Sequence, residues 1–230
     1  MTVKRWIGAV VSVAFLSPIS SALAADGFYV NAMAGVNFLQ NADNTGGGIT
    51  LTSEFEPGFG LAGAGGYKFS NGIRLEGELG YRRNALDRLV VTNDGGVGVA
   101  LGVGSLNGLS LDADDEVSAL SFMVNGFYDF DLGSGWMPYV GGGVGLALID
   151  AEASVLGVTV VNDDDTVFVY QIGGGIGYVA STSQPLEEYV VTLDYRYFAT
   201  ADPSLTDAAG GAFDSEFSGH YFGVGMRLQD

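Results

Sequence analysis

The one histidine of the 230-residue chain, His220, alternates with Glu216 and Ser218 near the C-terminus. An acid, a serine and a histidine could supply an orienting group, a nucleophile and a general base. Alternate positions on one strand, however, separate side chains by roughly 7 Å, because a strand rises about 3.3 Å per residue. Direct proton transfer needs a hydrogen-bonded pair about 3 Å apart. We therefore expect no catalytic residues here.

Two clusters of carboxylates could instead bind a cation. Asp112, Asp114 and Asp115 form the first cluster, and residues 163–165 form the second. Oxygen-rich clusters can hold calcium. Neither cluster has the spacing of a complete calcium-binding loop, and a run of like charges is usually solvated. The chain has no cysteine, which excludes thiolate ligands and disulfides. We expect no metal and no cofactor.

The most regular pattern of charges lies in the stretch IRLEGELGYR, residues 73–82. Arg74, Glu76, Glu78 and Arg82 alternate there with apolar or small residues. Successive side chains of a strand point to opposite faces, so one face is apolar and the other carries four charges. A water-soluble sheet would turn the charged face outward. A transmembrane β-barrel would turn it into the lumen.

Composition favours the transmembrane alternative. Hydrophobic residues make up 47% of the chain and charged residues 16%, against a usual charged share of about 25%. Beyond the N-terminus, no stretch is long and apolar enough for a membrane helix, which needs about 20 residues. Glycine accounts for 37 residues, about double its usual share. Together these features are typical of a β-barrel.

Residues 1–25 have the features of a secretory signal peptide. A basic start at Lys4 and Arg5 precedes an apolar core and a small-residue cleavage pattern around Ala24. We expect cleavage to leave residues 26–230 as the barrel domain. Its formal charge is then 7 basic minus 27 acidic residues, or −20, against −18 for the full chain. Such a charge excludes general attraction to nucleic-acid phosphates.

Alternating hydrophobicity predicts eight strands in the mature chain. Aromatic residues recur near both ends of the apolar faces, which is typical of two membrane-interface girdles. The connections alternate long and short, so all long loops fall on one side of the membrane. A soluble lipocalin-like barrel is the alternative, but the loop asymmetry and paired aromatic positions argue against it. The predicted strands cover residues 28–38, 58–69, 73–82, 117–130, 136–149, 166–179, 188–198 and 215–228.

The motifs IRLEGELGYR at residues 73–82 and LDYRYF at residues 193–198 carry a family resemblance. With the signal and the eight strands, they resemble outer-membrane barrels of the OmpA-like and opacity-protein class, especially alphaproteobacterial surface-antigen and "porin family" proteins. The resemblance implies an all-β fold: an eight-stranded antiparallel up-and-down barrel in the outer membrane of a Gram-negative bacterium. The chain departs from the family by ending in Met226–Asp230 rather than on an aromatic residue.

The resemblance also implies partners and a role. We expect a monomer that contacts outer-membrane lipid, lipopolysaccharide and the barrel assembly machinery, without nucleic acid. Its role would be structural or antigen- and adhesin-like, with an extracellular or host ligand reached through the loops. One alternative is a narrow porin for small solutes. A remote alternative is a lipid-modifying hydrolase, because Ser218 and His220 resemble the nucleophile and base of hydrolytic membrane barrels.

Eight strands leave an interior that side chains can fill. We expect inward charges to plug it, because the third and seventh strands stand opposite each other in the ring and buried charges require partners. Inward glycines at positions 141, 143, 145, 173, 175 and 177 should leave one wall without side chains. The expected ionic network consists of Lys68, Arg74, Glu76, Glu78, Arg82, Asp194 and Arg196.

Overall fold

The computed structural model describes most of the predicted barrel domain. Its described residues are 27–46, 48–100, 102–132, 134–155, 158–181, 188–201, 204–206, 212–214 and 217–229. The predicted signal peptide lies outside them. No helix in these ranges has the length and hydropathy that a membrane-crossing helix requires.

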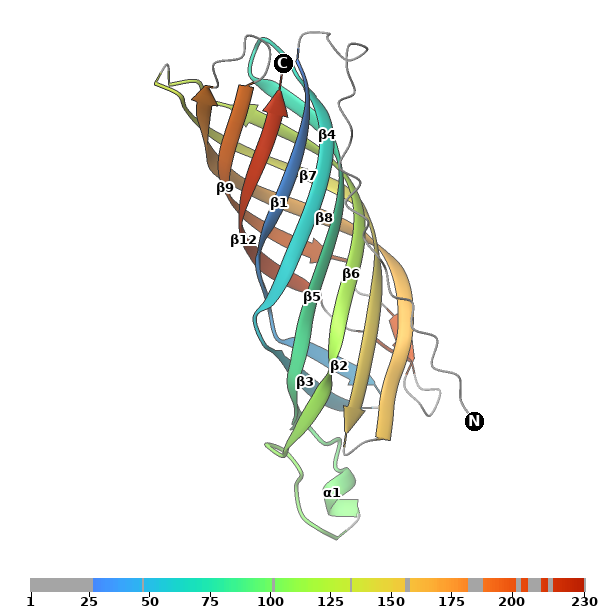
Figure 1. The fold of residues 1–230 in the computed structure, drawn as a ribbon. Helices are drawn as coiled ribbons and strands as arrows, with labels where there is room; N and C mark the ends of the chain where they lie inside the picture. The colour runs from blue at the N-terminus through green and yellow to red at the C-terminus, as the bar shows by residue number, and fades with distance from the viewer. Residues whose placement is uncertain are drawn as a thin grey trace, which may run out of the picture.

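Eight long antiparallel strands form a closed ring, which confirms the predicted fold class (Figure 1). Alternation of apolar and polar or small side chains produces them, as predicted. They are β1 (Phe28–Leu39), β4 (Gly58–Lys68), β5 (Ile73–Asn93), β6 (Ser110–Asp129), β7 (Trp136–Val155), β8 (Val158–Ser181), β9 (Glu188–Thr200) and β12 (Ser218–Gln229).

The first and last strands close the ring. β1 pairs with β12 from Tyr29–Gln229 to Leu39–Gly219, and with β4 on its other side. The remaining neighbours follow chain order from β4 to β9, and β9 pairs with β12. Because β5 and β9 are four places apart in a ring of eight, their inward side chains face each other across the lumen.

All four hairpins continue past the ring at the end away from the C-terminus. β5 and β6 stay paired as far as Val90 and Ser110, and β7 and β8 stay paired as far as Val155 and Val158. Four short strands extend the other two hairpins. They are β2 (Ala42–Gly46), β3 (Ile49–Phe55), β10 (Ser204–Thr206) and β11 (Ala212–Asp214).

Two of the long connections expected between the predicted strands, over residues 40–57 and 200–214, are therefore not wholly loops. β2 pairs with β3, β3 with β5, and β11 with both β2 and β10. The acidic clusters at residues 112–115 and 163–165, which lie outside the predicted strands, also belong to strands, β6 and β8. Outside the lipid both faces of a strand can meet water, so these segments pair without an apolar alternation.

The outward face of the ring is apolar and carries aromatic residues at two levels. Leu79, Phe122 and Leu193 expose 57%, 62% and 57% of their surface, although they lie in mid-strand. Aromatic contacts lie at both ends of this band, as between Phe28 and Tyr67 at one end. Phe38–Phe222 and Phe59–Tyr81 lie at the other. Phe28 and Phe38 of β1 are ten positions apart. In a tilted strand that separation spans about 25 Å, the height of an outer-membrane barrel's apolar band.

Candidate functional site in the barrel interior

Arg74 organises the charged side chains at the end of the lumen where the chain terminates. Outer-membrane barrels direct their short turns to the periplasm and their long hairpins outward, so we call this the periplasmic end and the other the outer end. Its Nε lies 2.8 Å from Asp129 Oδ1, and its Nη1 lies 3.6 Å from Glu76 Oε2. Nη1 also donates to the Tyr29 hydroxyl at 3.2 Å, and that hydroxyl donates to Glu76 Oε2 at 2.8 Å. Alternation along β5 aims Arg74 and Glu76 inward together, so the strand itself builds this pair.

Asp129 faces two further cations. Arg227 Nη1 lies 3.4 Å from Asp129 Oδ2, and Lys68 Nζ lies 3.7 Å from the same oxygen. The Lys68 side chain is 26% exposed, so it stands at the mouth of the lumen rather than inside it. Asp129 and Arg227 were absent from the network expected from the sequence. Strand alternation would have found both, because each points inward from β6 or β12.

A second cluster crosses the middle of the lumen. Arg196 of β9 forms an ion pair with Glu78 of β5, and its Nη2 lies 3.5 Å from Asp194 Oδ1. Thr192 donates its hydroxyl proton to Asp194 at 2.8 Å. The Arg196–Glu78 contact joins strands on opposite sides of the ring, so it fills the lumen rather than one wall.

Two amides connect the clusters. Asn125 Nδ2 donates to Glu76 Oε1 at 3.2 Å and to Glu78 Oε2 at 3.1 Å. Gln171 Nε2 donates to Asn125 Oδ1 at 2.8 Å. The carboxylates therefore accept amide hydrogen bonds in addition to their ion pairs, which offsets the cost of removing them from water.

Arg82 is held differently from the other lumen arginines. Its guanidinium lies 4.1 Å from the ring centroid of Phe198, and it donates to Ser121 Oγ at 3.3 Å. No carboxylate of the described residues lies within 4.0 Å of it. A cation over an aromatic face gains electrostatic stabilisation from the ring.

The buried charges of the lumen balance. Among the described residues, four arginines and four carboxylates of the lumen are each at most 6% exposed, so these eight carry no net formal charge, and Lys68 at the mouth adds one. They are Arg74, Arg82, Arg196, Arg227, Glu76, Glu78, Asp129 and Asp194.

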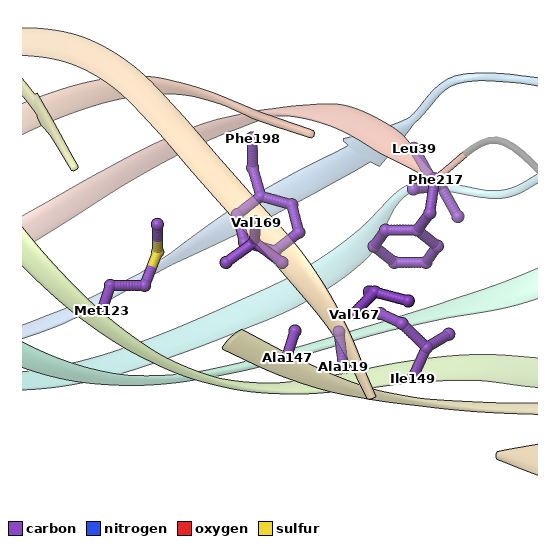
Figure 2. Close-up of a cluster of buried hydrophobic side chains, with 9 residues drawn as sticks. All are labelled: Leu39, Ala119, Met123, Ala147, Ile149, Val167, Val169, Phe198 and Phe217. Carbon is purple, nitrogen blue, oxygen red and sulfur yellow. The ribbon is translucent and has the colours of Figure 1, made fainter. Parts of the chain in front are cut away.

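The outer half of the lumen is filled by apolar side chains instead. Figure 2 shows nine of them projecting into the space enclosed by β1, β6, β7, β8 and β9. This cluster was not predicted from the sequence, although runs such as residues 146–149 and 167–170 are apolar on both faces. The members of this apolar cluster are Leu39, Ala119, Met123, Ala147, Ile149, Val167, Val169, Phe198 and Phe217.

The inward glycines do not leave an open wall, which corrects that expectation. A Cβ on Gly143 would collide with the side chain of Asn125, and one on Gly141 with the ring of Phe127. A Cβ on Gly175 would lie 2.5 Å from the Tyr139 hydroxyl. Side chains from other lumen positions thus lie against the glycine backbone, and the glycines allow the lumen to close.

The cavities agree with a closed lumen. A mouth of about 1070 Å³ opens at the periplasmic end, where its lining includes Lys68, Asp129 and Met137. Beside Arg82, Arg196 and Tyr221 there is only about 10 Å³. That is about the room one water molecule needs.

The residues suggested for hydrolysis do not form a catalytic pair. Gln40 stands between them, because Ser218 donates to Gln40 Oε1 at 2.9 Å and Gln40 Nε2 lies 3.1 Å from His220 Nε2. The other ring nitrogen of His220 lies 3.0 Å from the Tyr195 hydroxyl. Glu216 lies outside the described residues. Within the described ranges no group of three or more acidic, histidine or cysteine side chains is placed to hold a metal ion.

Two carboxylates beyond the lipid have shifted pKa values. Burial, together with the neighbouring charge of Asp164, raises the pKa of Asp150. The two residues are directly opposed in the β7–β8 ladder. Backbone N–H groups of Leu106 and Gly96 donate to Asp94 and lower its pKa.

A family model described as "Surface antigen" matches residues 28–186, more than half of the chain. No curated protein matches the sequence. Among solved structures, OprG from Pseudomonas aeruginosa is 13% identical with a TM-score of 0.51, covering 89% of this chain and 97% of OprG. Neisserial surface protein A is 18% identical (TM-score 0.47, coverage 89% and 98%). Ail of Yersinia pestis, solved with a heparin analogue, is 15% identical (TM-score 0.40, coverage 88% and 99%).

Proposed function

This chain belongs to the surface antigen family and is a β-barrel of a Gram-negative outer membrane, and we propose that it acts at the cell surface with its lumen closed. The observation that carries the proposal is the filled interior. Balanced ion pairs occupy the periplasmic half, and the apolar cluster occupies the outer half. A solute would have to displace both. The protein then interacts through its outer hairpins rather than by conducting.

The proposal extends to processing and partners. Residues 1–25 serve as the signal peptide and residues 26–230 as the barrel. The apolar band of the monomer contacts outer-membrane lipid and lipopolysaccharide after the barrel assembly machinery inserts it, and the outer hairpins meet an extracellular or host ligand. No enzymatic role is included, since Ser218 and His220 each bond to Gln40.

Conductance in planar bilayers tests the closed lumen. We expect little steady conductance from the wild type. The double variant Arg82→Ala/Arg196→Ala should stay largely closed, because the apolar cluster still seals the outer half. Adding Phe198→Ala breaks both seals, so the triple variant should conduct small ions.

A matched control is Arg83→Ala/Arg88→Ala combined with Phe198→Ala, because the side chains of Arg83 and Arg88 are 46% and 47% exposed outside the lumen. It should conduct far less than the lumen triple variant. Large, stable channels in the wild type would instead support the porin alternative.

A further inference from the structure

The loop at the end of the β5–β6 hairpin is apolar in a strongly acidic protein. Residues 95–111 contain no charged side chain, whereas the whole chain has a formal net charge of −18. Val99, Val103 and Leu109 expose 69%, 66% and 45% of their surface. We call residues 94–109 the apolar knob. Its one-turn helix α1 (Val97–Ala100) lies beyond β2 and β3, at the end opposite to the C-terminus (Figure 1).

The apolar knob satisfies much of its own backbone. The carboxylate of Asp94 accepts from the amides of Gly96 at 2.9 Å and Leu106 at 2.7 Å. The amide of Asp94 donates to Asn107 Oδ1 at 2.8 Å. Five further amides donate to carbonyls of the knob or its base, namely those of Ala100, Gly102, Val103, Gly108 and Leu109. Internal satisfaction of backbone groups is what a segment needs in order to leave water for lipid.

The composition of the knob suits a lipid surface better than a protein partner. Protein interfaces obtain most of their binding energy from aromatic and arginine side chains in fitted pockets. Residues 95–111 contain neither. Small aliphatic side chains without charge can enter the boundary between headgroups and acyl chains, because no ion loses its hydration there.

Acidic residues at the base of the apolar knob restrict the charge of the lipid surface that it could enter. Asp87 and Asp112 on β5 and β6, with Asp94 at the first position of the knob, outnumber the one cation of this base, Arg88, which forms an ion pair with Asp87. A membrane rich in anionic lipid has a negative surface potential that repels these carboxylates within a Debye length. A zwitterionic membrane has no such potential.

We propose that the apolar knob inserts into the surface of a second, zwitterionic bilayer that faces the bacterium. The inference rests on the proposed surface role and names the partner class for it. Three exposed aliphatic side chains bind weakly alone, but many copies in one membrane engage the opposing bilayer together, which multiplies the overall affinity.

Vesicle capture tests this inference. The mature chain is reconstituted at high density in proteoliposomes containing phosphatidylglycerol, and fluorescent protein-free phosphatidylcholine vesicles are added and co-sedimented. The wild type should capture them. Val99→Asp/Val103→Asp should reduce capture by about tenfold or more, because two charges must be dehydrated for insertion. Leu132→Asp is the matched control: Leu132 is 60% exposed in the β6–β7 turn at the opposite end, and its variant should capture as the wild type does.

Asp94→Ala is a second test, because it removes a charge but leaves the Gly96 and Leu106 amides without their acceptor. Capture of the phosphatidylcholine vesicles should fall, because the knob loses the acceptor that holds its backbone together; undiminished capture would contradict the need for a folded knob. Heat-dependent gel mobility verifies that each variant is folded.

Three results would overturn the inference: no capture by the wild type, undiminished capture by Val99→Asp/Val103→Asp, or clustering of wild-type proteoliposomes without added vesicles, which would identify a second copy as the occupant. Conductance by the wild type would contradict the closed lumen but would leave the capture result interpretable.

Discussion

Arg196 and Glu78 stand on opposite walls of the barrel, and neither has access to water in the described structure, where their side chains are 4% and 0% exposed. Each side chain stabilises the fold mainly by neutralising the buried charge of the other. Breaking a buried pair is costly because the remaining charge stays unmatched, whereas replacing both members by apolar groups of similar volume is often nearly neutral.

A double-mutant cycle therefore gives a specific expectation. Arg196→Met and Glu78→Met should each destabilise the folded barrel by about 3–5 kcal/mol, and the double variant should lose much less than the sum. Urea unfolding of the barrel in lipid vesicles measures the three free energies. Additive losses would mean that the two side chains act independently.

Asp94 gives a pH expectation outside the membrane. Its pKa is lowered below the usual 3.8 by the amides that donate to it, so it stabilises the apolar knob above that value. This contribution is lost as the pH falls through the lowered pKa, when the protonated carboxyl no longer binds the amides as strongly. The Leu106 amide proton resonance should shift with a midpoint below pH 3.8, and Asp94→Asn should abolish that titration.

The sequence could identify most of the inward charges but not their pairing. Arg74, Glu76 and Glu78 were placed inward by alternation alone, which is a property of one strand. The pairing depends on the stagger of the strands around the ring, which sets how far each strand is displaced along its neighbour. This stagger places Arg196 against Glu78 and Arg82 over the ring of Phe198.

At the scale of the strand, the position of a residue along the barrel decides whether an exposed side chain meets lipid or water. Leu193 in β9 and Leu132 in the β6–β7 turn are 57% and 60% exposed. Leu193 lies between the two aromatic levels, whereas Leu132 lies beyond the periplasmic one. The same exposed fraction therefore describes two different solvents.

Leu193→Arg should cost about 2–4 kcal/mol of folding free energy in lipid, because an arginine near the bilayer centre must be dehydrated. Leu132→Arg should cost close to nothing. Folding into liposomes followed by urea titration compares the two. Equal losses would place Leu193 away from the lipid face.

The eight long strands were predictable because lipid on one side and a lumen on the other enforce a period of two. The short strands β2, β3, β10 and β11 were not. They lie beyond the lipid, where alternation is not required, and their pairing depends on neighbouring hairpins such as β3 against β5. The apolar cluster was not predicted for a related reason. At its level both faces of β7 and β8 are apolar, so alternation does not show which side chains point into the lumen.

At the scale of the whole molecule, the interior has two zones with different ways of excluding water. The charged zone near the periplasmic mouth relies on matched ions and amides, as at Arg74 and Glu76. The apolar zone relies on close packing around Phe198. Arg82 lies over the ring of Phe198, so the two zones are in direct contact.

The continuation of the hairpins beyond the lipid determines what an antibody would meet at the cell surface. Asp150 and Asp164 stand side by side only because β7 and β8 remain paired there. An epitope that includes both combines residues from two strands and exists only in the folded protein. A linear peptide copying one of these strands would present the same residues without their neighbours, so immunisation with it would raise antibodies that recognise the denatured chain better than the intact bacterium.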